Sequence, residues 1–400
     1  MTHPFATIEQ AILELQAGRM IVLMDDENRE NEGDLVIAAE YATADAINFM
    51  SKYGRGLICL PMANEYIDKL GLPMMTSHNR SPYGTAFTVS IEAATGVSTG
   101  ISASDRARTV QVAIDENSGP ADLISPGHLF PLRACEGGVL QRAGQTEGSV
   151  DLARLAGLKS AAVICEIMND NGSMSRRDEL AAFSLQHNLL MVTIKDLIEY
   201  RIKHEILVAV TASSRIPLQG HGDFTMTVFS NQLDDAEHFA LVKAPYKSVP
   251  LVRVHSECIT GDVFGSCKCD CGSQLQQSLA LIAKEGGILI YLRQEGRGIG
   301  LANKLKAYAL QEQGYDTVEA NVQLGLPVDS RDYAIAYQIL TYLGVSDIRL
   351  LTNNPQKIES ISQYGLKVSE RVSLVIESTI ENRAYLKTKQ EKMGHLLAVE

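Results

Sequence analysis

The chain has 400 residues and a formal net charge of -12, a length that favours two or more domains. It is 45% hydrophobic and 21% charged, as is typical of soluble globular proteins. The acidic balance, the 6% aromatic content and the lack of tryptophan weigh against nucleic-acid binding. The sequence shows neither an apolar run long enough to span a bilayer nor a signal-peptide profile. Seven cysteines, several of them clustered, favour a reducing compartment, so we expect a cytoplasmic protein with no nucleic-acid or membrane partner.

The first half alternates strand-like with helix-like segments. The segments that we expect to form buried strands are residues 20–24, 35–39, 54–62 and 161–169, and the expected helices are residues 43–53 and 176–187. This alternation predicts a layered α/β domain.

An acidic segment, DDENRENEGD, lies between the first two apolar runs. It gathers six carboxylates around Arg29, namely Asp25, Asp26, Glu27, Glu30, Glu32 and Asp34. Such a run is usually a solvated face. Because this one interrupts a core-like segment, its hard oxygen ligands also suit a magnesium or manganese ion.

A fresh apolar run begins near residue 204, which predicts domains over residues 1–203 and 204–400. In the second half we expect strands at residues 238–244, 251–257 and 287–295, followed by helices around residues 302–313 and 332–343. The segments suggest an α+β domain, but their order does not fix its topology.

Cys258, Cys269 and Cys271 form a C-x10-C-x-C pattern. Three protein ligands with one open position are typical of a catalytic zinc, whose bound water has a pKa of roughly 7. Two alternatives stay open. Cys267 could add a fourth thiolate and close a structural site, or the cysteines could be unligated core residues.

The segment YLRQEGRGIG, residues 291–300, offers guanidinium groups together with closely approaching glycine backbone, which suits a phosphate-bearing ligand. Further along lie Asp329, Arg331, Thr352 and Lys357. Taken singly, each of these is more often a solvated surface residue than a catalytic one.

Residues 1 to about 203 resemble 3,4-dihydroxy-2-butanone 4-phosphate synthase through DDENRENEGD, SPYGTAFTVSIEAATGVSTGISASDRA, SPGHLFPLRA and AVICEIMNDNGSM. The family converts D-ribulose 5-phosphate to L-3,4-dihydroxy-2-butanone 4-phosphate and formate. The resemblance implies that His128 and Glu166 are catalytic. It implies a substrate site made of Arg29, Glu30, Asp34, Arg142, Ala143, Gly144, Gln145, Thr146 and Glu166.

The same resemblance implies a magnesium or manganese ion on Glu30. The second metal ligand of the family is a histidine in an H-T-E motif, and this chain has Gln145 there. Glutamine offers a carbonyl oxygen but is a weaker ligand and cannot shuttle protons.

Residues from about 206 to 400 resemble GTP cyclohydrolase II throughout. This implies zinc on Cys258, Cys269 and Cys271, with Cys267 not a ligand, and a magnesium ion accompanying GTP. Asp329 matches the proton acceptor, Arg331 the proposed nucleophile toward the α-phosphate, and Tyr308 a contact to the reacting end of the base. The implied GTP contacts are Arg253, Val254, His255, Ser256, Glu257, Gln274, Glu295, Gly296, Arg297, Thr317, Thr352 and Lys357.

We therefore expect a bifunctional riboflavin-biosynthesis enzyme that acts on ribulose 5-phosphate and on GTP. The product from GTP would be 2,5-diamino-6-(5-phosphoribosylamino)pyrimidin-4-one, with formate and pyrophosphate. One alternative is a cyclohydrolase with an impaired, structural first domain, and another is a zinc-binding scaffold or regulatory protein. Both families form homodimers, which implies a dimer or a higher homo-oligomer.

Overall fold

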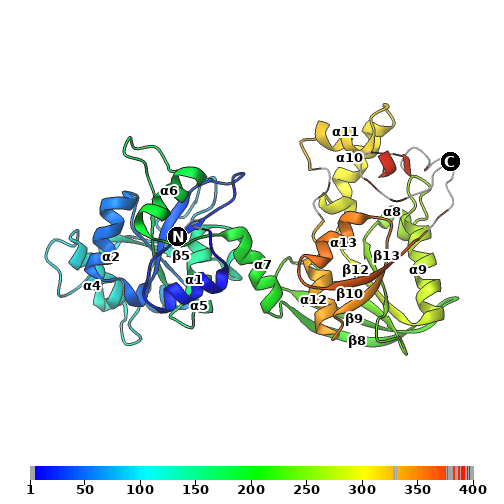
Figure 1. Ribbon diagram of the computed structural model, residues 1–400, viewed down its shortest axis with the longest axis horizontal. Helices are drawn as coiled ribbons and strands as arrows, with labels where there is room; N and C mark the ends of the chain where they lie inside the picture. The colour runs from blue at the N-terminus through cyan, green and yellow to red at the C-terminus, as the bar shows by residue number, and fades with distance from the viewer. Residues whose placement is uncertain are drawn as a thin grey trace. The chain divides into compact units, whose positions relative to one another are not determined.

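The computed structural model describes residues 5–327, 329, 331–374, 376, 382, 386–387, 389–391, 394 and 396, so parts of the terminal segment KTKQEKMGHLL lie outside the described residues. The chain divides within α7 into two compact units, residues 1–201 and 202–400. Each unit is built on its own seven-stranded sheet (Figure 1).

The N-terminal sheet has the strand order β4-β5-β3-β6-β2-β1-β7. Its strands are β1 (Ile21–Met24), β2 (Gly33–Ala38), β3 (Cys59–Met62), β4 (Ile91–Ala93), β5 (Leu123–Arg133), β6 (Ala162–Glu166) and β7 (Met191–Thr193). β1 and β2 are antiparallel and fully buried, and the acidic segment connects them. The predicted buried strands on either side of that segment are confirmed.

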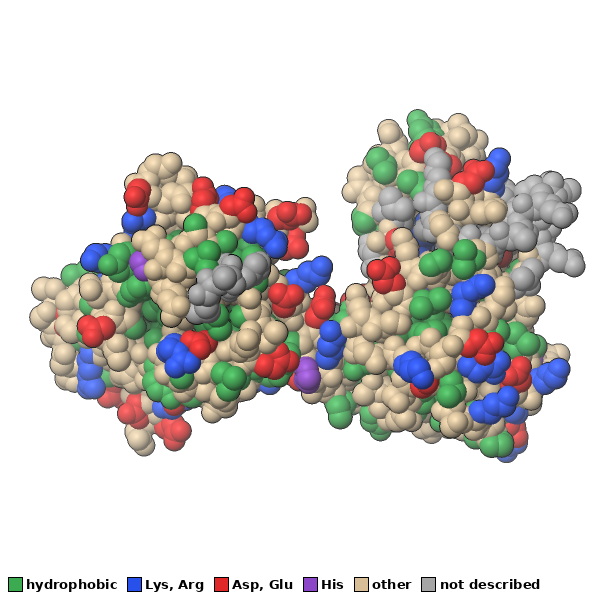
Figure 2. All heavy atoms as spheres, viewed as in Figure 1, with side chains coloured by type: hydrophobic (Ala, Val, Ile, Leu, Met, Phe, Trp, Pro, Cys, Tyr) green, Lys and Arg blue, Asp and Glu red, His purple; other side chains and the backbone are tan. Residues whose placement is uncertain are grey.

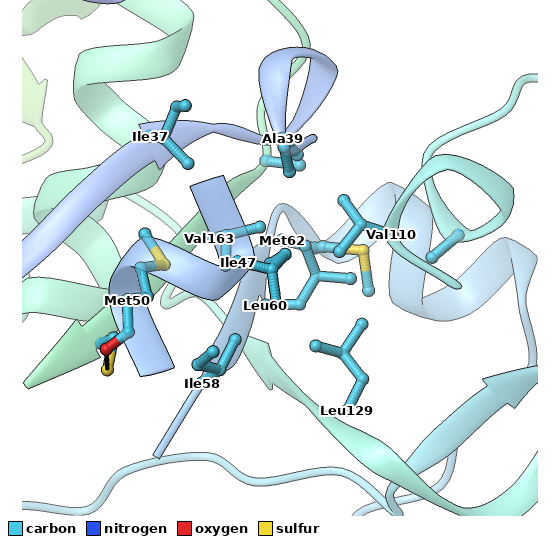
Figure 3. Close-up of a cluster of buried hydrophobic side chains, with 14 of the residues drawn as sticks. Ile37, Ala39, Ile47, Met50, Ile58, Leu60, Met62, Val110, Leu129 and Val163 are labelled. Atoms are coloured by element: carbon cyan, nitrogen blue, oxygen red, sulfur yellow. Dashed lines mark hydrogen bonds between the residues drawn. The ribbon is translucent and has the colours of Figure 1, made fainter. Parts of the chain in front are cut away.

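Helices cover both faces of this sheet. They are α1 (Ile8–Gln16), α2 (Ala44–Phe49), α3 (Asn64–Lys69), α4 (Ala103–Ala113), α5 (Gln145–Leu155), α6 (Arg177–His187) and α7 (Ile194–His204). Side chains alternate between the faces of a strand, so Leu23 packs toward α1 and α5 while Val22 packs on the opposite side. In Figure 3, Ile47 of α2, Leu60 of β3 and Val110 of α4 turn toward one another in that second layer. The predicted layered α/β domain is confirmed.

The C-terminal sheet has the order β14-β13-β11-β12-β10-β9-β8. Its strands are β8 (Val208–Leu218), β9 (Gly222–Asn231), β10 (His238–Lys243), β11 (Leu251–Ser256), β12 (Gly287–Leu292), β13 (Asp347–Leu351) and β14 (Lys367–Val372). β11 to β14 are mutually parallel, whereas β10, β9 and β8 add antiparallel strands at one side. The three predicted strands are present, and the mixed sheet is the topology that the sequence left open.

Helices of the C-terminal unit are α8 (Ile259–Asp262), α9 (Cys271–Glu285), α10 (Leu301–Gln311), α11 (Thr317–Gln323), α12 (Ala334–Tyr342) and α13 (Pro355–Ser362). α9 packs on one face of the sheet through Ile282, and α12 packs on the other through Ile339 (Figure 1). α10 and α11 contact each other, and α10 also contacts the loop that follows β12.

The described helices include none with the length and apolar character needed to cross a membrane. On the face that Figure 2 shows, Lys and Arg side chains stand among Asp and Glu side chains on each unit. With a net charge of -12, binding of an anionic substrate requires local groups of cations.

Candidate active sites

Three cysteines meet at the carboxyl ends of the parallel strands of the C-terminal sheet, where open α/β sheets commonly bind ligands. Cys258 follows β11, while Cys269 and Cys271 lie at the start of α9. Their sulfur atoms all lie within 4.8 Å of one another, and Cys258 and Cys269 are buried. Gly261 makes this approach possible, because a Cβ there would lie only 3.0 Å from the Cys269 sulfur and 3.1 Å from the Cys258 sulfur. These residues could hold a soft metal ion.

Cys267 stands apart from this cluster. Its side chain is exposed, and its sulfur lies 3.9 Å from the Gly265 carbonyl oxygen. Residues 267 and 268 form a turn rather than an extended strand, so Cys267 does not share a strand face with Cys269 and Cys271. The described residues therefore group three thiols and leave a fourth position open.

Lys304 and Glu295 lie beside Cys258 in a network of hydrogen bonds. Lys304 Nζ donates to Cys258 Sγ at 3.1 Å and to Glu295 Oε1 at 2.8 Å, and Glu295 Oε2 accepts from the Ile259 amide at 2.6 Å. Hydrogen bonds from Cys269 and Cys271, and then the Lys304 ammonium, lower the pKa of Cys258 far below its usual range. Our sequence analysis missed Lys304, although it precedes Tyr308 by one helical turn and so shares its face of α10.

One pocket gathers almost every residue predicted for the cyclohydrolase. The predicted residues that line it are Arg253, His255, Ser256, Glu257, Cys258, Cys269, Cys271, Gln274, Glu295, Gly296, Arg297, Tyr308, Thr317, Arg331, Thr352 and Lys357. Val254 is outside the lining, but its carbonyl oxygen accepts from Lys357 Nζ at 2.9 Å. Asp329 is outside it too and forms a salt bridge with Arg331. The pocket also contains residues that the sequence did not single out, among them Asn321, Asn353, Asn354 and Lys389.

Three arginines and three lysines line this pocket, namely Arg253, Arg297, Arg331, Lys304, Lys357 and Lys389. Burial, and then the guanidinium groups of Arg253 and Arg331, lower the pKa of Lys357 well below its usual range. Arg253 Nε and Arg297 Nη1 are buried without a hydrogen-bond partner. Buried donors normally have partners, so this wall of the pocket suits a polyanionic ligand that would supply them.

The acid of this site is held as a carboxylate. Burial alone would raise the pKa of Asp329, but the Arg331 guanidinium outweighs burial and lowers it. Arg331 Nε donates to Asp329 Oδ1 at 2.8 Å. Nearby, His255 Nε2 lies 3.0 Å from Asp262 Oδ2, and Asp262 also accepts from the Cys258 amide at 3.0 Å. Asp262, which the sequence analysis missed, therefore connects His255 to Cys258 of the thiol cluster.

The glycine-rich loop adopts a constrained conformation. Gly296 and Arg297 both have a positive φ of 63° within the 3-10 helix Glu295–Gly298. A non-glycine residue rarely adopts this conformation, and such positions cluster at functional sites. A Cβ on Gly296 would lie 3.2 Å from Lys304 Cβ, so this glycine also permits the close approach of α10.

Two predicted carboxylates of the N-terminal unit stand opposite each other. Asp34 on β2 pairs with Glu166 on β6 in the antiparallel register, so both side chains point to the same face of the sheet. Burial, then the Glu166 charge, raise the pKa of Asp34 well above its usual range. Burial is also the main cause that raises the pKa of Glu166, whose Oε2 accepts from the Leu57 amide at 2.8 Å. The pair holds protons more tightly than free carboxyls.

Arg29 connects the acidic segment to the start of α5. Its Nη1 donates to Asp25 Oδ2 at 2.8 Å and to Gln145 Oε1 at 3.1 Å, and it lies 3.0 Å from Glu30 Oε2. Gln145 is 6% exposed, and its Nε2 has no hydrogen-bond partner. The carbonyl oxygen that we expected to bind a metal thus accepts a hydrogen bond from Arg29.

Residues 142–146 of the predicted substrate site lie at the N-terminus of α5. Arg142 donates to Thr85 Oγ1 and to the Tyr83 carbonyl oxygen, each at 3.0 Å. A Cβ on Gly144 would lie 2.5 Å from Arg142 Nη1 and 3.0 Å from Arg29 Nη2, so this glycine lets two guanidinium groups converge. Ala143 is exposed and Thr146 is buried. Tyr83 and Thr85, absent from our predicted site, hold Arg142 in place.

His128 on β5 is oriented by a residue that the sequence analysis did not single out. His128 Nδ1 and Glu92 Oε1, on neighbouring β4, form a hydrogen bond. Across the described part of the chain, no hydrogen bond joins His128 to Asp34 or Glu166. Arg29 contacts both Glu30 and Gln145, and the charge of Glu30 in turn acts on Asp34 and Glu166.

Comparisons with protein families divide the chain in the same order. A family model described as 3,4-dihydroxy-2-butanone 4-phosphate synthase matches residues 9–200, and one described as GTP cyclohydrolase II matches residues 209–373.

Relatives extend over both parts. The riboflavin biosynthesis protein RibBA of Aquifex aeolicus is 54% identical over 398 residues, which cover 98% of this chain and 98% of that protein. RibBA of Synechocystis sp. is 53% identical over 400 residues, and the aligned residues cover 98% of this chain and 72% of that protein. Among solved structures, RibBX from A. baumannii, a two domain 3,4-dihydroxy-2-butanone 4-phosphate synthase, is similar with a TM-score of 0.70 and 35% identity, over 93% of this chain and 100% of that chain.

Proposed function

Since the chain belongs to the RibBA family of riboflavin biosynthesis proteins, we propose which of its residues carry out the two reactions of that family. The protein is bifunctional. Its N-terminal unit is a 3,4-dihydroxy-2-butanone 4-phosphate synthase, a lyase that acts on D-ribulose 5-phosphate. Its C-terminal unit is a GTP cyclohydrolase II, which releases formate and pyrophosphate from GTP. Together they start both branches of riboflavin biosynthesis.

The observation that carries the assignment of the GTP site is the pocket that brings three thiols together with three arginines and three lysines. We propose that Cys258, Cys269 and Cys271 hold zinc, because thiolates are soft ligands and three of them leave a catalytic position open. When bound, zinc would supply a water molecule of lowered pKa for attack on the guanine ring.

The remaining residues of that pocket bind and orient GTP. Arg297, Arg331 and Lys357 offer cationic partners to the triphosphate and, with the magnesium that accompanies it, balance the charge that develops when pyrophosphate leaves. Asp329, held as a carboxylate by Arg331, would accept a proton. Tyr308 lies 5.8 Å from Lys304 Nζ, measured to the ring centre, on the side of the pocket near the thiols, where it would contact the reacting end of the base.

For the synthase we propose proton transfer by Glu166, Asp34 and His128. Burial raises the pKa of both Glu166 and Asp34, so each carboxyl holds a proton more readily than a free carboxyl does and could both take and return one. Glu92 would hold the His128 ring in position. Arg29 and Arg142 would bind the sugar phosphate at the start of α5, where anions are favoured.

We propose that Glu30 holds a magnesium or manganese ion for the synthase, because its carboxylate is a hard oxygen ligand beside other carboxylates. Gln145 could add its amide oxygen only after releasing the hydrogen bond from Arg29. When bound, the ion would stabilise the enediolate.

Formate release tests both assignments on one purified protein. GTP and D-ribulose 5-phosphate are supplied separately, the first with zinc and magnesium and the second with magnesium or manganese, and formate is measured in each case. We expect formate from both substrates. Formate from GTP alone would reduce the N-terminal unit to a structural domain, and formate from neither would support a metal-binding scaffold.

We further propose that the protein acts as a homodimer, as resemblance to the two families implies, and that it does so in the cytoplasm, as its cysteine content favours. Sedimentation of the purified protein at the concentrations used in the assays tests the assembly, and a monomeric species with full activity would contradict it.

A further inference from the structure

Lys304 donates a hydrogen bond to Cys258, one of the three proposed zinc ligands, and is not a ligand itself. From α10, its ammonium group reaches Cys258 Sγ at 3.1 Å and Glu295 Oε1 at 2.8 Å, and its side chain is only 12% exposed. The second oxygen of Glu295 accepts from the amide of Ile259, which directly follows Cys258. Lys304 and Glu295 thus hold Cys258 from both its side chain and its backbone.

The charge of the cluster explains what this contact could do. Three thiolates and one divalent cation carry a net charge of -1, and Cys258 and Cys269 are buried. A buried charge without a partner is costly. One ammonium group at hydrogen-bond distance from a sulfur would offset this charge, to which Glu295, the second acceptor of Lys304, adds one more negative charge. The ammonium group would also favour a further anion, such as hydroxide, at the open position.

Lys304 also fixes the helix that carries Tyr308. The two side chains lie on the same face of α10, with Lys304 Nζ 5.8 Å from the centre of the Tyr308 ring. The absence of a side chain at Gly296 allows this helix to approach the glycine-rich loop. A change at Lys304 therefore affects the thiol cluster and the wall of the pocket together.

We propose that Lys304 is a positioning residue of the zinc centre. Its ammonium group donates to the Cys258 sulfur, offsets part of the negative charge of the three-thiolate site and, through Glu295, keeps Cys258 and the glycine-rich loop in register. The inference rests on the proposed function of the C-terminal unit, but its first two tests require no turnover of GTP.

The test uses the full chain with Lys304→Met, Lys304→Arg and the control Lys306→Met. Lys306 lies on the same helix, is exposed and donates to Asn303 rather than to the cluster. We expect Lys304→Met to hold zinc about tenfold more weakly in competition with a chelator, as is usual when an outer partner of a metal ligand is removed. In cobalt-substituted protein, the thiolate-to-metal charge-transfer band should shift in Lys304→Met and keep its position in Lys306→Met.

Activity gives a third measurement. Loss of the nearby cation should move the acidic limb of the pH profile for formate release from GTP to higher pH, because hydroxide is then less stabilised. Lys304→Arg should restore most of the zinc retention and the wild-type pH profile. Formate release from ribulose 5-phosphate by the same chain reports on folding of the N-terminal unit, and circular dichroism of each variant reports on the whole chain.

Three outcomes decide the proposal. The proposal would be overturned if Lys304→Met matched Lys306→Met in zinc retention, cobalt spectrum and pH profile. Equal loss in Lys304→Arg and Lys304→Met would overturn the role of the positive charge. The third outcome is that wild type retains zinc better than Lys304→Met but does not hydrolyse GTP. That outcome would support the role of Lys304 and refute the proposed function instead.

Discussion

Cys258 and Cys267 provide a matched pair for testing the metal site, since one lies in the thiol cluster and the other is exposed beside it. We predict that Cys258→Ser abolishes formate release from GTP and lowers the zinc content, because a lost thiolate weakens a three-ligand site. Cys269→Ser and Cys271→Ser should behave alike, and Cys267→Ser should retain both zinc and activity. Zinc loss in the Cys267 variant equal to that in the Cys258 variant would show that a fourth thiolate takes part.

Gln145 stands where the resemblance to the synthase family implies a metal-binding histidine. Its amide oxygen accepts from Arg29, and its buried Nε2 lacks a partner. We predict that the wild type turns over ribulose 5-phosphate but needs more magnesium or manganese than Gln145→His, because the Gln145 amide oxygen must first release its hydrogen bond from Arg29 before it can bind the ion. Metal titrations of both proteins measure this difference. No formate from the wild type at saturating metal, together with formate from Gln145→His, would mean that the first site is inactive.

Ionisation of Asp34 in the synthase site should make the folding stability of the N-terminal unit depend on pH. Its pKa is raised in the folded protein, so the stability it contributes is fully present below the unfolded pKa of about 3.9 and is lost as pH rises through the folded pKa. Asp34→Asn should therefore stabilise metal-free protein at pH 8 and have little effect near pH 4. Each kcal/mol that the substitution adds to the free energy of unfolding would raise the melting temperature of the unit by about 2 to 4 °C. Thermal unfolding in a chelator at both pH values measures the effect, and an equal gain at both would exclude ionisation of Asp34 as its cause.

At the scale of elements, the two reactions of the GTP site come from different parts of the chain. Arg331 lies in the segment before α12, and Tyr308 lies on α10 beside the thiols. We predict that Arg331→Ala stops pyrophosphate release, because the departing phosphates lose a cationic partner. Tyr308→Phe should chiefly slow ring opening. Formate and pyrophosphate measured in the same reactions distinguish the two, and wild-type pyrophosphate release from the Arg331 variant would refute its role.

Parallel strands bring these parts together. Cys258 follows β11, Glu295 follows β12 and Thr352 follows β13, so residues far apart in sequence reach one edge of the sheet. The antiparallel strands β10, β9 and β8 extend the sheet on the side of β12. In the N-terminal unit, the antiparallel pairing of β2 with β6 places Asp34 opposite Glu166, although the two residues are far apart in sequence.

At the scale of the whole molecule, each unit has its own core and its own candidate site. We predict that the two activities can be removed one at a time. Glu30→Gln should abolish formate release from ribulose 5-phosphate, because a metal ligand loses its charge, and leave the GTP reaction within about twofold of wild type. Cys258→Ser should do the reverse. Loss of both activities in either variant would show that the units depend on each other.

The sequence by itself determined the order of the two domains, most strands around the acidic segment and the three thiols, and the cations of the GTP pocket. These are local signals, since apolar runs, clustered charges and motif spacing are readable without tertiary contacts. Sequence could not show which polar residues support them, because such partners are chosen by packing across the sheet. Lys304 lies 46 positions from Cys258, and Arg29 lies 116 positions from Gln145. Only the tertiary structure brought Lys304 to a thiol, Glu92 to His128 and Arg29 to the amide oxygen of Gln145, since hydrogen bonds depend on distances of about 3 Å that no spacing along the chain encodes.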